Sequence, residues 1–280
     1  MTGTPPESAP SPLLGESLSS LERHLVSFER VLLCLDFDGT LAPHVDDPDA
    51  ATLTPDNRRV LETLRQQSAL DIAIVSGRAL ADLKDRVGIE SFTYAGNHGL
   101  ESDVWTDSEE STHPRVKRYC SFIGQICAEL ETQLTIPGCH IENKEVTATV
   151  HYRNADIAPD EIEERVASVV EEIGGESLQL VPGTEIVEIR PAIEWNKGHA
   201  VRQFEKRCPG ECLTIYIGDD TTDEDAFRAI EPEGISIYVG TDDETDASYY
   251  VPDVDGVTEF LEWLAETGID ALQRNLDDQK

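Results

Sequence analysis

The stretch Val31-Leu-Leu-Cys-Leu-Asp-Phe-Asp-Gly-Thr-Leu41 decides the fold. Its apolar run, Val31 to Leu35, predicts a strand buried on both faces, as in a parallel sheet. Asp36 and Asp38 follow two positions apart, so both carboxylates can face one point if the backbone stays extended. Open α/β sheets bind ligands at this end of their strands, and paired carboxylates that would otherwise repel each other suit Mg2+. The alternative is an Asp-rich turn with no chemistry.

The rest of the chain supplies the partners that such a strand needs. Apolar strands and amphipathic helices alternate before residue 100 and again after residue 196, a pattern that predicts right-handed βαβ units. We therefore expect an α/β fold with a doubly wound parallel sheet. The expected strands are 70–75, 92–95, 213–217 and 235–239, and the expected helices are 55–67, a helix that follows residue 78 and ends near 87, a helix from 197, a helix after 222, and 257–267.

The middle third has a different order. A helix over 114–134, strands over 140–142 and 146–152, a helix over 159–173 and strands over 178–181 and 186–189 are expected. That order predicts a smaller α+β domain with a helix-covered antiparallel sheet. We expect this domain, residues 103–191, to be inserted into a core formed by 20–102 and 192–280. Residues 1–19, rich in Pro, Ser and Gly, are expected to be a flexible segment.

The charge of the chain limits its partners. The sequence has 56 acidic and 22 basic residues, a net charge of −34. Nucleic acids and anionic membranes need basic patches, so neither is expected as a partner. Acids spread along the whole chain, with few lysines, are typical of a halophilic cytoplasmic protein whose repulsion is screened by molar salt. Most of these acids are therefore expected to be solvated surface.

Cysteine usage and the start of the chain also favour the cytoplasm. No apolar run approaches the ~20 residues of a membrane span, and the first residues lack the regions of a signal peptide. Six cysteines have neither CxxC nor metal-site spacing, so we expect reduced thiols.

Ser76-Gly77-Arg78 ends the second expected strand of the core. The Ser76 hydroxyl and the following amides can meet an anion beside Asp36, and Arg78 can help to hold it. A plain turn and a solvated arginine are the alternatives.

Lys197 begins a helix directly after the insertion, where the helix dipole disfavours a cation. A role in binding an anion at the end of the sheet explains this placement. A surface lysine is the alternative.

The run Gly218-Asp-Asp-Thr-Thr-Asp-Glu-Asp225 follows another apolar strand. Asp219 is nearest the strand end and is expected to bind metal, with Asp220 in support. For Asp223 and Asp225, capping of the next helix is as good an interpretation as catalysis.

Four strand-end sites, in the order Asp-x-Asp, Ser, Lys and Asp-Asp, resemble the haloacid-dehalogenase superfamily of Mg2+-dependent phosphatases. The resemblance implies that Asp36 attacks phosphorus and that Asp38 is the general acid/base. Mg2+ would be held by Asp36, the backbone carbonyl of Asp38, and Asp219, with Asp220 supporting. Ser76 and Lys197 would hold the phosphoryl oxygens.

Residues 32–227 more narrowly resemble the trehalose-6-phosphate phosphatase family. The motifs are Ala95-Gly-Asn-His-Gly-Leu-Glu101, Ile141-Glu-Asn-Lys144, His151-Tyr-Arg-Asn154, Val187-Glu-Ile-Arg-Pro191, Asn196-Lys-Gly198 and Gly218 to Phe227. By that resemblance, the inserted domain is a cap that binds the sugar through Glu142, Lys144, Arg153 and Glu188, and Asn97 and His98 lie at the seam between core and cap. Strand-edge charges and a turn are the alternatives. The family often has a lysine where Thr184 stands here.

The expected function is Mg2+-dependent hydrolysis of trehalose 6-phosphate by a cytoplasmic monomer, in a pathway shared with a trehalose-phosphate synthase. One alternative is a phosphatase of the same superfamily that acts on another sugar phosphate or compatible-solute precursor. A second is a non-enzymatic regulatory or binding domain on the same fold.

Overall fold

The computed structural model describes residues 10–45, 47–105, 112–113, 115–183, 185–241 and 244–278. The chain forms two compact units, one of Met1–Gly99 with Trp195–Lys280 and the other of Leu100–Glu194. We call these the core unit and the inserted unit. The boundaries expected from the sequence, 103 and 191, remain a prediction. No helix within the described residues is long and apolar enough to cross a membrane.

The core unit contains a parallel sheet, as the sequence predicts for this α/β fold. Its strands lie in the order β1-β12-β11-β10-β2-β3-β4, and every pair along this order is parallel. The register places Leu35 of β2 between Ile217 of β10 and Ile74 of β3, so these strands end at the same edge. The strands are β1 (Ser11–Pro12), β2 (Arg30–Leu35), β3 (Leu70–Val75), β4 (Thr93–Gly96), β10 (Cys212–Gly218), β11 (Ile235–Val239) and β12 (Tyr249–Val251).

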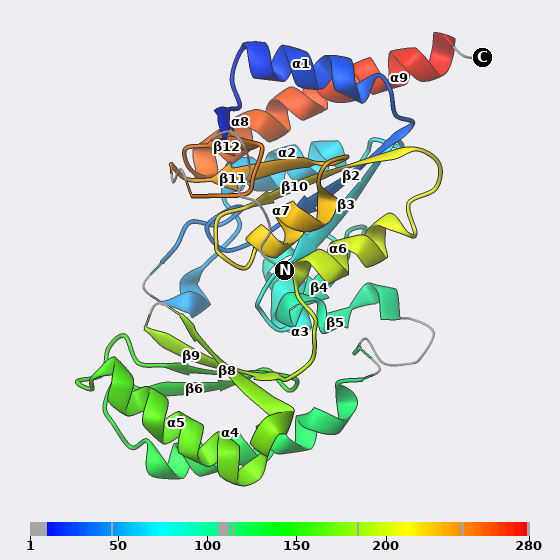
Figure 1. Ribbon diagram of the computed structural model, residues 1–280. Coiled ribbons are helices and arrows are strands. Elements are labelled where there is room, and N and C mark those ends of the chain that lie inside the picture. Colours follow the sequence, from blue (N-terminus) through cyan, green and yellow to red (C-terminus); the bar gives the residue numbers. More distant parts are fainter. Residues whose placement is uncertain are drawn as a thin grey trace. The chain divides into compact units, whose positions relative to one another are not determined.

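Helices cover both faces of this sheet. Figure 1 shows α1, α8 and α9 on one face and α6 and α7 on the other. The first face holds the main apolar core, where Val31, Leu33 and Leu35 of β2 are fully buried. The helices are α1 (Glu16–Leu25), α2 (Pro55–Leu64), α3 (Leu80–Val87), α6 (Lys197–Glu205), α7 (Glu224–Ile230), α8 (Val254–Trp263) and α9 (Ile269–Asp278), with short turns at Pro48–Ala50 and Asn97–Gly99 and a π-helical turn at Leu264–Gly268.

The inserted unit is an antiparallel sheet with two helices on one face. Its strands lie in the order β6-β7-β9-β8, and α4 and α5 cover one side (Figure 1). Ile141, Val150 and Val187 share the helix-covered face, so the polar residues between them face the other way. The bounds are β5 (Glu101–Ser102), α4 (Cys120–Gln133), β6 (His140–Asn143), β7 (Ala148–His151), α5 (Pro159–Ile173), β8 (Leu178–Gly183) and β9 (Ile186–Pro191), with short helical turns at Asp103–Trp105, Lys117–Tyr119 and Gly175–Ser177.

Two expectations differ from the structure. Residues 10–19, expected to be flexible, contribute β1 and the start of α1, because Leu13 is buried beside a strand that pairs with β12. Residues 1–9 lie outside the described part. The thiols are not all reduced, because Cys208 and Cys212 form a disulfide between α6 and β10. Spacing alone did not predict this bond, since the turn that brings the two residues together is a feature of the fold.

Candidate active site

Two adjacent strands, β2 and β10, bring the first acids together. The amide of Asp36 donates to the carbonyl of Ile217 at 2.9 Å, so Asp36 continues the ladder between the two strands. Asp219 follows the end of β10 directly. Gly39, with φ +78°, turns the chain so closely past Asp219 that a Cβ on this residue would lie 2.1 Å from the Asp219 carboxylate. The loop from Asp36 to Gly39 therefore folds around the carboxylate of Asp219.

A third acid, Asp223, completes the group. Oxygen atoms of Asp36, Asp219 and Asp223 lie within 4.8 Å of one another. The Asp223 side chain is fully buried and does not cap α7; it accepts from Lys197 and Tyr216 at 2.8 and 2.6 Å. The capping interpretation is therefore wrong for Asp223.

Lys197 is the cation of this group. Its Nζ lies 2.8 Å from Asp223 and 3.1 Å from Asp36, and its side chain is 3% exposed. Asn196 caps α6 through the amide of His199, which fixes Lys197 in the first turn. The surface alternative is therefore wrong.

Burial and neighbouring charges shift the pKa values of these groups in opposite directions. Burial raises the pKa of Asp36 well above its usual range, and Lys197 offsets only part of this rise. Burial lowers the pKa of Lys197, but the charges of Asp223 and Asp36 outweigh burial and raise it, so the ammonium stays protonated. Burial likewise raises the pKa of Asp219, against a hydrogen bond from His44.

A divalent cation fits this donor set. One ammonium group balances only part of the charge of three gathered carboxylates, and hard oxygen ligands suit Mg2+. The carboxylate of Asp220 is not in the group; it accepts from the amide of Thr221 at 2.7 Å, while its own amide donates to Asp223. The supporting metal role of Asp220 stays a prediction.

Asp38 and Arg78 form a second pair beside the acids. The Arg78 guanidinium donates two hydrogen bonds of 2.7 Å to Asp38 and a third of 3.1 Å to Asp82. Arg78 also lies over the Phe37 ring, 5.5 Å from its centroid. This arrangement turns the guanidinium toward Asp38, whereas the sequence suggested that it would hold the substrate anion.

Ser76 and the turn after β4 are close in space. Ser76 is buried; its hydroxyl accepts from the amide of Arg78 at 3.1 Å, and its backbone carbonyl accepts from the amide of His98 at 2.9 Å. Asn97 and His98 are buried, with φ of 48° and 56°. The amide of Asn97 donates to the carbonyl of Arg78 at 2.7 Å, so this turn supports the Ser76 loop.

The inserted unit gathers most of the expected sugar-binding residues on one sheet face. Cross-strand register aligns Glu142, Thr149 and Glu188 on neighbouring strands. Glu142 lies 3.7 Å from Lys144 and 3.0 Å from His151. Glu188 pairs with Arg190.

Arg153 lies apart from that row of acids. It follows β7 and pairs with Glu185 at 2.8 Å, with 43% of its side chain exposed. Thr184, where the family often has lysine, lies outside the described residues.

Sequence reasoning missed His44 and Tyr216. His44 lies 2.8 Å from Asp219, and this hydrogen bond is the main cause of a raised pKa for His44. Tyr216 alternates with the core-facing Ile215 and Ile217, and that alternation was the available signal for a side chain facing α6 and α7.

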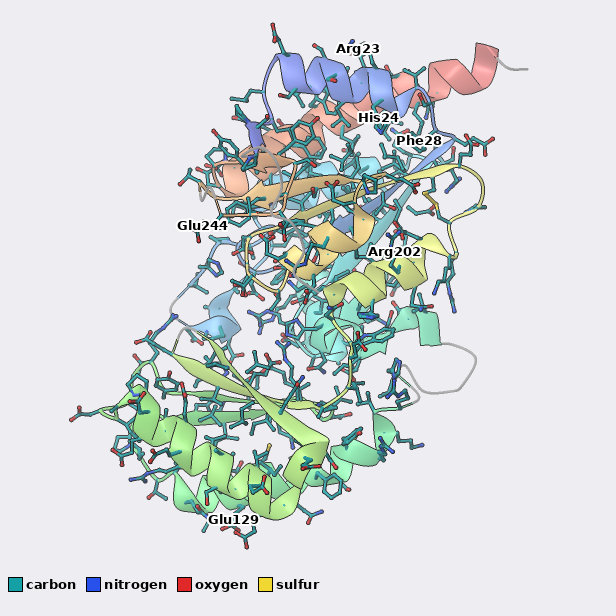
Figure 2. The ribbon with its side chains drawn as sticks, viewed as in Figure 1. Arg23, His24, Phe28, Glu129, Arg202 and Glu244 are labelled. Atoms are coloured by element: carbon teal, nitrogen blue, oxygen red, sulfur yellow. A yellow bond between two sulfur atoms is a disulfide. The ribbon has the colours of Figure 1, made fainter. Side chains whose placement is uncertain are left out.

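A cavity of about 440 Å³ lies elsewhere in the core unit. Its lining includes His24, Phe28 and Arg202, all labelled in Figure 2, and Cys212 at the opposite end of β10 from Asp219. Arg202 there is paired with Glu205 at 2.8 Å. The cavity contains none of the gathered acids.

Known proteins resemble this chain in sequence. A family model described as trehalose-phosphatase matches residues 34–255. The trehalose-phosphate phosphatase of Mycobacterium marinum is 39% identical over 223 residues, which cover 78% of this chain and 56% of that protein. The chain thus spans about half the length of the curated relatives it matches.

Solved structures show the same fold. The structure of the C. albicans trehalose-6-phosphate phosphatase C-terminal domain is 25% identical with a TM-score of 0.72, covering 92% of this chain and 99% of that one. A trehalose-6-phosphate phosphatase related protein is 24% identical with a TM-score of 0.74, covering 85% and 99%.

Proposed function

Because the chain belongs to the trehalose-phosphatase family, we propose that it hydrolyses trehalose 6-phosphate to trehalose and phosphate. The observation that carries the proposal is the group of Asp36, Lys197, Asp219 and Asp223 near the ends of β2 and β10, of which all but Asp219 are buried. A regulatory domain on this fold does not require a nucleophile, a buried ammonium group and further carboxylates at one edge of the sheet. The group therefore favours an enzyme over a binding module.

The reaction proceeds in two displacements on the core unit. A carboxylate oxygen of Asp36 attacks phosphorus, and the bond from phosphorus to the sugar oxygen breaks. Asp38 gives its proton to the departing oxygen, then takes a proton from the water that attacks the aspartyl-phosphate. Phosphate leaves, and Asp36 regains its carboxylate.

Other residues bind the phosphoryl oxygens, position Asp38 or would hold the metal. Lys197 and Ser76 bind the equatorial oxygens of the phosphoryl group, where negative charge is spread during transfer. Arg78 holds Asp38 through two hydrogen bonds and is assigned here as its positioning residue. Asp36, Asp219, Asp223 and the backbone carbonyl of Asp38 would hold Mg2+, which when bound polarises the phosphoryl group and offsets its charge.

The inserted unit supplies the sugar contacts. Glu142 and Glu188 present carboxylates for sugar hydroxyls, and Lys144 and Arg153 supply cations for the ester. Asn97 and His98 support the loop that carries Ser76. A matched pair of substrates tests this division, because p-nitrophenyl phosphate needs the core chemistry but none of the sugar contacts.

The setting of the reaction is part of the proposal. The excess of 56 acidic over 22 basic residues supports a cytoplasm of high salt. We expect a monomer that takes its substrate from a trehalose-phosphate synthase. Light scattering in molar KCl gives the mass of the particle, and a dimer mass would contradict the monomer.

A substrate panel in molar KCl tests the activity. Phosphate release is measured from trehalose 6-phosphate, glucose 6-phosphate, sucrose 6-phosphate and glucosyl-3-phosphoglycerate. Turnover of the trehalose ester far above the others supports the proposal. Turnover of another ester alone keeps the chemistry and replaces the substrate, and no turnover by folded protein favours the regulatory domain.

A further inference from the structure

The Tyr216 hydroxyl is buried inside the catalytic group. It donates to Asp223 Oδ1 at 2.6 Å, and the Nζ of Lys197 lies 2.8 Å from the same oxygen. Nζ also lies 3.1 Å from Asp36. We propose that Tyr216 is a positioning residue whose hydroxyl fixes where Asp223 and Lys197 lie relative to the nucleophile. The activity arm of this inference rests on the proposed function.

The packing of the Tyr216 ring fixes the position of its hydroxyl. Tyr216 is fully buried and lies in the middle of β10, aligned with Cys34 of β2 and Ser236 of β11. Its ring meets the edge of Phe227 from α7, with centroids 5.8 Å apart and planes at 79°. The hydroxyl is therefore as rigidly placed as the strand and helix that flank it.

Removing the Tyr216 hydroxyl removes one of the hydrogen-bond donors to the Asp223 carboxylate. Its Oδ1 accepts from Tyr216 and Lys197, and its Oδ2 accepts from the Asp220 amide at 3.0 Å. A buried carboxylate that loses one donor depends more on those that remain. Lys197 is then drawn toward Asp223 and away from Asp36, so the nucleophile loses part of its support.

Tyr94 provides a matched control within the core unit. It is 2% exposed and its hydroxyl donates to the Ile89 carbonyl at 2.7 Å. Tyr94→Phe and Tyr216→Phe therefore each remove one buried phenol hydrogen bond. The Tyr216 hydroxyl donates to Asp223, whereas the Tyr94 hydroxyl donates to a backbone carbonyl. A loss of metal binding or turnover that both variants share therefore reports general loosening of the core unit.

The experiment compares the two variants with wild type in two assays. Calorimetry of Mg2+ binding to substrate-free protein is expected to show about 10-fold weaker affinity for Tyr216→Phe, because partners of metal ligands typically contribute 10- to 100-fold. Turnover of trehalose 6-phosphate is expected to show kcat reduced about 10-fold or more with KM nearly unchanged. Tyr94→Phe is expected to stay within about twofold of wild type in both.

The outcomes separate the inference from the proposed function. Wild-type kcat and Mg2+ affinity in Tyr216→Phe overturn it, as do equal losses in both variants. If wild type binds Mg2+ but hydrolyses no ester, the proposed function fails and the calorimetric comparison still decides the role of Tyr216. Tyr216→Met, which fills most of the ring volume without a hydroxyl, replaces a phenylalanine variant that does not fold and is expected to lose affinity equally.

Discussion

Gly198 is the point at which helix packing determines the position of Lys197. It is buried at the start of α6, where this helix packs on α7. A Cβ on Gly198 would lie 2.3 Å from the Asp225 backbone oxygen and 2.9 Å from the Ala229 Cβ. Gly198→Ala must therefore push the two helices apart by about 1 Å to reach ordinary van der Waals contact. Lys197 precedes this residue and moves with it.

The substitution is expected to affect activity more than stability. Alanine gains about 1 kcal/mol over glycine inside a helix, while overpacking costs about 1–3 kcal/mol. The free energy of unfolding should thus fall by at most about 2 kcal/mol. A shift of 1 Å in a catalytic group can cost about 100-fold in rate, so kcat should fall by about that factor.

Gly124→Ala is the control. Gly124 lies inside α4, and a Cβ there would meet nothing within 4 Å. This variant should gain up to about 1 kcal/mol with unchanged kcat. Thermal unfolding and phosphate release are measured for both variants. A Gly198→Ala enzyme with kcat within about threefold of wild type would refute the argument, because the predicted helix shift would then not reach Lys197.

Three further substitutions test other contacts of the two units. Burial would raise the pKa of Asp82, but hydrogen bonds from Arg86 and Arg78 outweigh it and lower that pKa. Asp82→Asn should therefore be less stable than wild type above about pH 4, and this difference in stability should vanish as the pH falls through the lowered pKa. A gap between the urea midpoints of the two proteins that stays constant down to about pH 2 contradicts the prediction. Glu188→Gln should raise KM for trehalose 6-phosphate about 10-fold and leave p-nitrophenyl phosphate turnover unchanged; equal losses on both substrates count against a sugar contact. Gly39→Ala should weaken Mg2+ binding about 10-fold by displacing Asp219, and calorimetry showing wild-type affinity rules this out.

The sequence predicted the elements and their class because apolar runs and turns are local signals. Val31 to Leu35 indicated a buried parallel strand, and β2 is that strand at the centre of the parallel sheet. Residues 159–173 were expected to form a helix, and α5 has those bounds. Local signals did not reveal β1, because a two-residue strand is defined by its partner β12.

The partners of each side chain were harder to predict, because they depend on packing between distant elements. Nothing in the sequence distinguished a capping Asp223 from one that contacts Lys197, since the close approach of α6 and α7 decides between them. The sequence likewise did not indicate that Asp38 and Asp82 accept hydrogen bonds from Arg78. Spacing indicates the edge of the sheet where a residue lies, and tertiary contacts determine what it does there.

Asp36 is proposed here as the nucleophile of a metal-dependent sugar phosphatase. The most direct measurement is phosphate release from trehalose 6-phosphate by wild type and Asp36→Asn, each in molar KCl with Mg2+ and with EDTA. We expect turnover by wild type in Mg2+ and background rates in the other three reactions. Near wild-type turnover by folded Asp36→Asn, or undiminished wild-type turnover in EDTA, would contradict it.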